Sequence, residues 1–408
     1  MALCRYLPVP SDRMGVIWSL LTIKESVVLE YGPAGTTHFS MGLFSNLGID
    51  QENQLFTTHL DEEDVVMGDS SRLVSAVKEI DENLKPKVIF VIASSISSMI
   101  GTDVLGICNT IRDEVDAKII VFTEGGLKGD YSIGIESVYN KLFKDLPLPL
   151  VEVEKNEKSF NILGASMGEY RIDSDVEEIK RMMGESFGMH INCSMCTETS
   201  ITDVEKIASA DINIVLSFEA LEGAKYLEEK YGIPYVYVLP YGYSATMKWL
   251  KAISEKLDRK INPIVMKRLM GKNMPLAMRK MYAGMMSDFV DSSYIFANYD
   301  KLCGLSDFME ELGITKNHLV CKHSLKRVTK LKLPKLDKLE YYEKEKDRLD
   351  VLASMKESYV LADDISKHLM DKSNTFVKIS HPIMDTSIVA KHLPLMGERG
   401  ADYILEHL

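Results

Sequence analysis

Between residues 161 and 242, short apolar segments alternate with amphipathic ones. Four segments have the length and composition of a strand, and they begin at Asn161, Met189, Ile212 and Tyr235. The segments between them carry apolar residues at helical spacing, and Gly232 marks the end of one such helix. Parallel strands need a crossover connection, which is usually a helix. This alternation therefore predicts a parallel sheet with helices on both faces.

Local signals predict where some of these helices begin. Asp173 or Ser174 is placed to cap a helix whose apolar face includes residues 176–183. Ser200 and Asp203 are three residues apart and have the pattern of a capping box. Residues 316–348 hold eleven Lys/Arg against five Asp/Glu, and we interpret them as a solvated helix face, with docking to an acidic partner as the alternative.

The same strand pattern recurs on both sides of this stretch. Further strands are predicted at 88–93, 119–122, 293–297 and 375–379. Two prolines and a run of charges at 146–158 are typical of a domain junction. We expect an α/β fold of three Rossmann-like domains with parallel sheets around a central cleft. The expected boundaries are 1–155, 156–262 and 263–408.

Composition excludes several classes of protein. The 408 residues carry a net charge of −12, which argues against nucleic-acid binding. No apolar run has membrane-spanning length, and the N-terminus has no export signal, so we expect a cytoplasmic protein without a membrane partner. Six cysteines in such a chain indicate reduced thiols or metal ligands rather than a disulfide scaffold.

Three stretches carry a resemblance to a known family. The segments EIKRMMGESFGMHINCSMCTETSITDVEKI and INIVLSFEALEGAKYLEEKYGIPY resemble the middle domain of nitrogenase component 1 proteins. The end, ISHPIMDTSIVAKHLPLMGERGADYILEHL, resembles the C-terminus of that family. The resemblance implies three Rossmann-like domains and an assembly of homologous chains. It also implies an iron–sulfur cluster at the interface between chains and a large metal cofactor or a tetrapyrrole in the cavity.

The first-domain loops resemble the cluster loops of this family but lack most of its cysteines. Cys4 resembles the first family cysteine and is the candidate metal ligand. The glycines of Gly32-Pro-Ala-Gly35 match a second motif, but Thr36 stands at its cysteine position, and Ser95 stands at the third. Hydroxyls are poor replacements for the soft thiolates that iron requires. We predict that this chain alone holds no stable four-iron cluster there, so a partner chain supplies most thiolates or the cluster is absent.

The cavity loops hold a second set of candidates. Cys193 and Cys196 form a CxxC in the loop that, in the family, lines the cofactor cavity. Ser217 is the nearest match to the cysteine that ligates the cofactor, and His381 falls close to the position of its histidine ligand. We predict that Cys193 or Cys196 lies within about 12 Å of His381 across the cleft. The alternative is that both cysteines pack as small apolar residues and that His381 only packs at a strand end.

Two functions remain open. In the first, the chain is a subunit of a nitrogenase-like reductase, paired with a homologous component 1-like chain. Because the sequence has no P-loop of its own, low-potential electrons would come from a separate ATP-dependent iron–sulfur reductase with a P-loop. In the second, the chain is a non-catalytic scaffold or structural subunit for metal-cluster or cofactor assembly beside a cysteine-bearing homologous chain. The sequence leaves the substrate undetermined.

Overall fold

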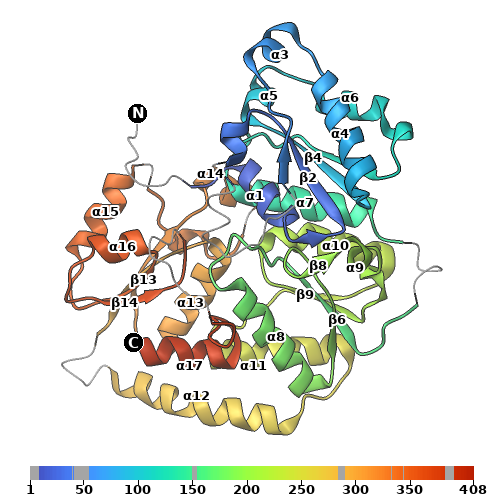
Figure 1. Cartoon of the computed structure of the whole chain (residues 1–408). Helices are drawn as coiled ribbons and strands as arrows, with labels where there is room; N and C mark the ends of the chain where they lie inside the picture. Colours follow the sequence, from blue (N-terminus) through green and yellow to red (C-terminus); the bar gives the residue numbers. More distant parts are fainter. Residues whose placement is uncertain are drawn as a thin grey trace.

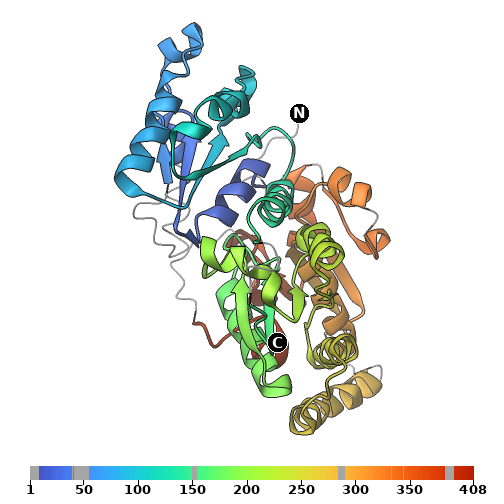
Figure 2. The same ribbon diagram turned by 90° about the vertical axis from the view of Figure 1, so that its right-hand side faces the viewer.

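The computed structural model describes residues 9–38, 40, 55–148, 154–283, 290–331, 333–342, 344–381 and 390–408. In these ranges the chain forms three four-stranded sheets, and every strand pair in them is parallel. Each sheet and the helices that cover it are called a unit below. The first unit stands above the other two (Figures 1 and 2). The prediction of an α/β fold with three Rossmann-like parallel sheets is confirmed.

The first sheet has the order β3-β2-β4-β5. Its strands are β2 (Ser26–Tyr31), β3 (Leu55–Thr57), β4 (Val88–Ala93) and β5 (Lys118–Phe122). Every residue of β2 and β4 is buried, because helices cover both faces of the sheet. The helices are α1 (Asp12–Leu20), α3 (Glu62–Met67), α4 (Ser71–Leu84), α5 (Ser95–Met99), α6 (Val104–Thr110) and α7 (Tyr131–Asp145).

The second sheet has the order β10-β9-β6-β7 and corresponds to the stretch with the clearest sequence pattern. Its strands are β6 (Ser159–Leu163), β7 (His190–Ser194), β9 (Ile212–Val215) and β10 (Tyr235–Val236). Its helices are α8 (Ile172–Phe187), α9 (Ile201–Glu205), α10 (Leu221–Tyr231) and α11 (Tyr243–Leu257). The capping box of Ser200 and Asp203 is present, and α10 ends at Gly232 in the left-handed conformation, as predicted.

The predicted cap of α8 is wrong. The helix begins at Ile172 with Arg171 at the N-cap position, and no side chain caps it. Ser174 donates instead to the carbonyl of Ala390 at 3.1 Å, and Asp175 accepts from backbone amides near the C-terminus. Long-range contacts thus hold these two side chains within the first turn of the helix.

The third sheet has the order β12-β11-β13-β14. Its strands are β11 (Ser292–Ala297), β12 (Lys316–Cys321), β13 (Tyr359–Ala362) and β14 (Thr375–Lys378), and its helices are α13 (Tyr299–Glu311), α14 (Leu325–Leu331), α15 (Glu345–Ser354) and α16 (Asp364–Leu369). The interpretation of 316–348 as a solvated helix face is wrong for its first residues. They form β12, whose last three residues are buried.

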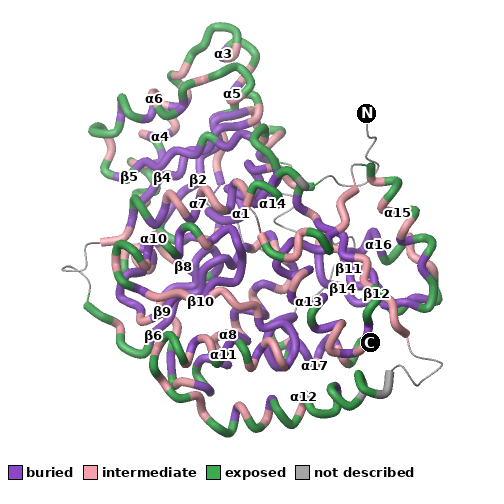
Figure 3. Tube along the Cα trace, turned by 180° about the vertical axis from the view of Figure 1, so that it is seen from behind, coloured by how far each residue is buried: buried purple, intermediate pink, exposed green. Residues whose placement is uncertain are grey.

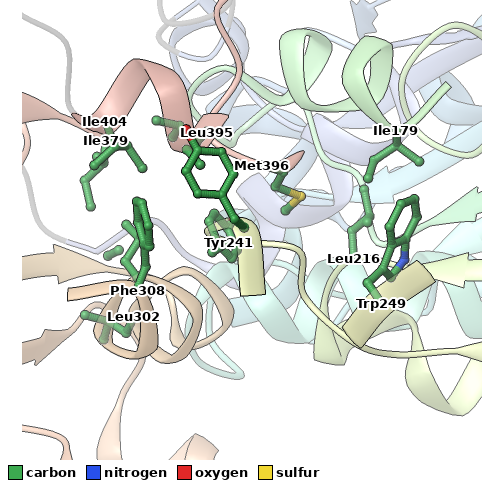
Figure 4. Close-up of a cluster of buried hydrophobic side chains, with 14 of the residues drawn as sticks. Ile179, Leu216, Tyr241, Trp249, Leu302, Phe308, Ile379, Leu395, Met396 and Ile404 are labelled. Atoms are coloured by element: carbon green, nitrogen blue, oxygen red, sulfur yellow. The ribbon is translucent and has the colours of Figure 1, made fainter. Parts of the chain in front are cut away.

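The three units share their cores. One apolar cluster spans the second and third sheets and includes Tyr241, Trp249 and Phe308 (Figure 4). Another joins α1 and α7 to the second unit, where β1 (Ile23–Lys24) also pairs with β8 (Thr199–Ser200). The C-terminal helix α17 (Gly397–His407) returns to pack on α8 and α11. These shared cores fix how the units meet.

The outer helices are the exposed part of the molecule, and the strands are its buried part (Figure 3). The most peripheral helix is α12 (Pro263–Ala283), at the lower edge in Figure 1. Within the described residues, no helix combines the length and the apolar composition needed to span a bilayer.

Candidate functional site where the three sheets meet

A small cavity lies at the carboxyl ends of strands from two sheets, against a helix of the first unit. Its lining residues are Ile135, Gly164, Ser166, Glu169, Ile172, Asp175, Leu216, Ser217, Glu219, Tyr241, Asn298, Asp300, Lys301 and Met396. Only about 20 Å³ of it can hold the centre of a water molecule, which is room for about one water. Such an edge of a parallel sheet is where ligands commonly bind.

One glycine allows two strand ends to close the cavity. Gly164, directly after β6, has a φ of +86°. A Cβ at this position would lie 2.6 Å from the backbone nitrogen of Ser217, two residues after the end of β9. Only glycine combines this conformation with so close an approach.

Asp300 is the most firmly held acid of the cavity. Its carboxylate accepts a hydrogen bond from the backbone N–H of Phe218 at 3.0 Å and another from the hydroxyl of Tyr237. Burial raises the pKa of Asp300 to about 7, although both hydrogen bonds act to lower it. Asp300 therefore links the helix start after β11 to the loop after β9.

Glu219 is the least satisfied acid of the cavity. Its side chain is buried, and Oε2 has no hydrogen-bond partner among the described residues. Burial raises the pKa of Glu219 to about 8, while nearby His323 lowers it and the charge of Asp300 raises it further. The carboxyl therefore holds a proton near neutral pH.

Lys301 supplies the positive charge of the cavity lining. Its ammonium lies 3.3 Å from the carboxylate of Glu169 and donates to the carbonyl of Ile379 at 3.0 Å.

Asp175 is a further buried acid of the lining, and it accepts from the amides of Leu395 and Met396 at 2.6 and 2.8 Å. Burial raises the pKa of Asp175 to about 6, against the lowering effect of Lys301. The lining is thus rich in buried acids, each held by a different element.

His323 lies between Asp130 of the first unit and Glu219 of the second. The ring is buried, its Nδ1 is 3.7 Å from Asp130 Oδ1, and it packs edge-on against Phe218. Burial would raise the pKa of Asp130, but His323, the Ser132 hydroxyl and the Ser324 amide together lower it below its usual value. The three units therefore meet at titratable side chains.

Sequence reasoning missed the cavity acids and His323. Glu219 is two residues beyond Ser217, and Asp300 follows the strand β11 in a helix-start turn. Both positions could have been recognised as strand-end positions of parallel sheets. No local signal distinguishes His323, which reaches the site only because of how the third unit packs.

The predicted cysteine pair lies in an apolar core. Cys193 and Cys196 belong to the cluster shared by the first and second units, and neither lines the cavity. The Cys193 thiol is 3.3 Å from the hydroxyl of Thr199. Burial raises the pKa of both thiols to about 12, so both stay protonated.

His381 lies beside the cavity without lining it. Its ring meets Tyr170 edge-on at 5.8 Å, and its Nε2 has no hydrogen-bond partner among the described residues. Burial, together with the charges of Lys322 and Lys301, lowers the pKa of His381 to about 3, so the imidazole is neutral. A cofactor site shared by His381 and the cysteines stays a prediction without support from this geometry.

A buried ion pair between α1 and β2 lies beside the loop that contains Thr36. The Arg13 guanidinium donates to both carboxylate oxygens of Glu30, from Nε at 2.8 Å and from Nη2 at 2.5 Å, and both side chains are buried. Thr36, at a family cysteine position, donates to the Pro33 carbonyl at 2.9 Å, and Thr37 donates to Glu30 at 2.6 Å. Protein groups thus surround the place where thiolates were expected.

The other loop positions fall close by. A Cβ on Gly32 would lie 2.4 Å from the Cβ of Ser94, and one on Gly126 would lie 2.9 Å from the hydroxyl of Ser95. Gly35 is exposed, with open space around it. Cys4 lies outside the described residues.

Neither location fits the metal groups that the resemblance implies. Within the described ranges, no three His, Cys, Asp or Glu side chains are grouped to hold a metal ion. Among the described residues of the first unit, Thr36 and Ser95 place hydroxyls where the resemblance implies thiolates. The cavity at the junction is water-sized, which is far smaller than a large metal cofactor or a tetrapyrrole needs.

Comparison with known proteins identifies the family. The model of the family described as "Nitrogenase component 1 type Oxidoreductase" matches residues 11–408, nearly the whole chain. The chain belongs to this family. The resemblance recognised in the sequence is confirmed. Family members bind iron–sulfur or metal clusters and form complexes with homologous chains and an iron-protein reductase.

Relatives of this component 1 type chain differ in what they do. The chain is 27% identical over 245 residues to the nitrogenase molybdenum-iron protein alpha chain of Clostridium pasteurianum, covering 58% of this chain and 45% of that protein. It is 22% identical over 287 residues to a light-independent protochlorophyllide reductase chain of Heliobacterium modesticaldum, covering 70% and 54%. The chain spans about half the length of the curated relatives it matches.

A solved structure supports the same fold. The chain is similar to a structure titled "Nitrogenase Cp1 at pH 6.5", with a TM-score of 0.80 and 19% identity, over 100% of this chain and 93% of that one. At this identity the similarity concerns the fold alone.

Proposed function

We propose that this chain is the cluster-free subunit of a nitrogenase-like reductase complex. It pairs with a homologous component 1-type chain that supplies the thiolates for any iron–sulfur cluster. The complex receives low-potential electrons from a separate ATP-dependent iron–sulfur reductase. Family membership supports the complex, and the chain's own residues support its role as the partner without a cluster.

The buried Arg13–Glu30 pair carries this proposal. It joins α1 to β2 next to one of the loops that hold a cluster in the family, and Thr36 of that loop donates to Glu30 at 3.4 Å. Breaking a buried ion pair with this many hydrogen bonds to make room for a metal cluster would strongly destabilise the protein. Protein hydrogen bonds therefore stabilise this region without a cluster. This fits a chain that contributes structure to the complex and no ligands to a cluster.

The cavity supports a reductive reaction in such a complex. Reduction of an unsaturated substrate consumes protons together with electrons. Three buried carboxyl groups, on Asp175, Glu219 and Asp300, line one cavity with pKa values raised toward neutrality. Carboxyl groups with pKa values near 7 can take up and release protons at neutral pH.

A second candidate is a non-catalytic scaffold for cofactor assembly. The water-sized cavity favours it, since the described residues leave no space for a large substrate at the junction. One of the relatives is also named as a cofactor biosynthesis protein, the NifE protein of Clostridium pasteurianum, at 25% identity over 238 residues.

Anaerobic purification alone and with the homologous component 1-type chain of the same organism tests the proposal. The chain alone should contain little chelator-resistant iron, and the pair should contain iron with visible absorption. Adding the ATP-dependent iron–sulfur reductase and ATP should bleach that absorption and stimulate ATP hydrolysis. A stable pair that neither bleaches nor stimulates hydrolysis would favour the scaffold, and iron held firmly by this chain alone would contradict the cluster-free subunit.

A further inference from the structure

Two buried polar atoms in the loop after β9 have no hydrogen-bond partner among the described residues. They are the hydroxyl oxygen of Ser217 and Oε2 of Glu219. The two residues are only 8% and 3% exposed, so bulk water does not reach these atoms freely. Buried polar atoms in native proteins are nearly always paired, with a protein group or with an ordered water. The two unpartnered atoms therefore call for a ligand.

Both residues line the cavity where the three sheets meet. The space for water-sized probe centres in this cavity is about 20 Å³. One water needs about 10–15 Å³ of such space, so the cavity has room for a single water. A water in a cavity also needs two to four polar partners. The Ser217 hydroxyl and the Glu219 carboxyl provide the first two.

Gly164 keeps the space beside the Ser217 hydroxyl free. A Cβ on Gly164 would lie 2.7 Å from Ser217 Oγ, so any side chain at this position would fill that space. The backbone N–H of Gly164 donates to the hydroxyl of Tyr139 at 2.8 Å, which fixes the glycine in place. The turn after β6 thus leaves room for a partner next to the hydroxyl.

Other polar groups of the lining already have protein partners. Asp300 accepts from a backbone amide and from the hydroxyl of Tyr237, and Asp175 accepts from two backbone amides. The hydroxyl of Ser166 accepts from a backbone N–H at 3.3 Å. Of the described residues that line the cavity, only the two discussed above have a buried side-chain atom without a partner. A ligand is therefore needed at one end of the cavity only.

The chemistry of the lining favours water over a cation. The ammonium of Lys301 belongs to the same lining and would repel a second positive charge. Within the described ranges, no three His, Cys, Asp or Glu side chains are grouped to hold a metal ion. The Ser217 hydroxyl and a protonated Glu219 carboxyl can each donate or accept a hydrogen bond, and water can answer either role.

We propose that the cavity is a binding site for one ordered water, which bridges the hydroxyl of Ser217 and Oε2 of Glu219. The water completes the hydrogen bonding of the loop after β9 at the junction of the three units. It also gives the Glu219 proton a first acceptor, because a carboxyl can transfer its proton through one water. That use rests on the proposed function, whereas the binding site does not.

A crystal structure of the full chain, at a resolution that shows ordered waters, tests the site. We expect one density peak at about 2.5–3.0 Å from both Ser217 Oγ and Glu219 Oε2. Crystals soaked in a thallium(I) salt are the second arm, because the anomalous scattering of thallium reveals a site for a monovalent cation. An empty cavity, or a thallium signal in it, would overturn the proposal.

Infrared spectroscopy tests the same water in solution. The C=O stretch of the protonated Glu219 carboxyl is identified by its loss in Glu219→Gln. Ser217→Val removes the hydroxyl and fills the space, so the water should leave and the band should move to higher frequency. If this variant does not fold, Ser217→Ala, which removes only the hydroxyl, takes its place. Ser166→Ala is the control in the same lining and should leave the band unmoved.

The outcomes separate this proposal from the proposed function. A band that stays in place when Ser217 is changed overturns the water site, and so does a cavity without density. Either result leaves the proposed function standing, because pairing, iron content and bleaching are measured independently of the water. Failure to pair with the homologous chain contradicts the proposed function and leaves the water site standing.

Discussion

At the scale of single residues, Glu219 makes the stability of the protein depend on pH. The pKa of Glu219 is raised by burial from 4.5 to about 8. The folded state therefore binds a proton that the unfolded chain releases, and this contribution to stability is lost as pH rises from about 4.5 to about 8. Asp300 and Asp175 act in the same direction, since burial raises the pKa of each.

We expect Glu219→Gln to remove the part of this pH dependence that Glu219 contributes and to leave the part that comes from Asp300 and Asp175. Relative to the variant, the wild type should lose on the order of 2 kcal/mol of unfolding free energy between pH 5 and pH 8. Urea unfolding at several pH values measures this difference. Glu222→Gln is the matched control, because Glu222 is exposed and pairs with Lys225 on the same helix. A wild-type curve parallel to that of Glu219→Gln would show that Glu219 titrates normally.

The second prediction at this scale concerns the stability that the Arg13–Glu30 pair provides. Arg13→Met should destabilise the protein by about 3–5 kcal/mol, because Glu30 would be left as a buried charge without its partner. Combining it with Glu30→Leu should recover part of this loss. Lys225→Met breaks an exposed pair and should cost less than about 1 kcal/mol. An equally small effect of Arg13→Met would mean that water reaches Glu30.

At the scale of elements, the turn between β6 and α8 depends on Gly164. Gly164→Ala should destabilise the protein by at least about 2 kcal/mol, since the new methyl group would combine a positive φ with a contact to the Ser217 backbone. Gly232→Ala is the control, with a φ of +72° and nothing within 4 Å of a built Cβ. It should cost about 1 kcal/mol. Thermal and urea unfolding compare the two, and equal losses would argue that the contact to Ser217 relaxes freely.

Elements governed by local signals could be predicted from the sequence. The capping box at Ser200 and the helix end at Gly232 were predicted correctly because each depends on residues a few positions apart. The cap of α8 could not be predicted, because Ser174 and Asp175 bond to a segment more than 200 residues away. The strand β12 was not predicted because its first three residues are charged or polar, which hides the apolar pattern of a strand. It forms a strand by pairing with β11.

At the scale of the whole molecule, the sequence predicted the three sheets but not the site between them. Parallel sheets follow from strand–helix alternation, which is a property of each stretch by itself. The cavity depends on how units pack, and its acids come from α8, the loop after β9 and the start of α13. The predicted pair of cysteines, Cys193 and Cys196, is buried away from the cavity because it packs in an apolar cluster with residues of α1 and α7. We propose domain boundaries near residues 155 and 262, with α17 crossing back to the second unit.

The central claim is that this component 1 type chain has kept the fold of its family and replaced the cluster by protein groups. Iron analysis of the anaerobically reconstituted chain, after chelation and without any partner, tests it most directly. We expect iron far below one atom per chain, because Thr36 and Ser95 supply hydroxyls where thiolates are needed and the buried Arg13–Glu30 pair lies next to Thr36. About four chelator-resistant irons per chain or per pair of chains, with the visible absorption of a cluster, would contradict the claim.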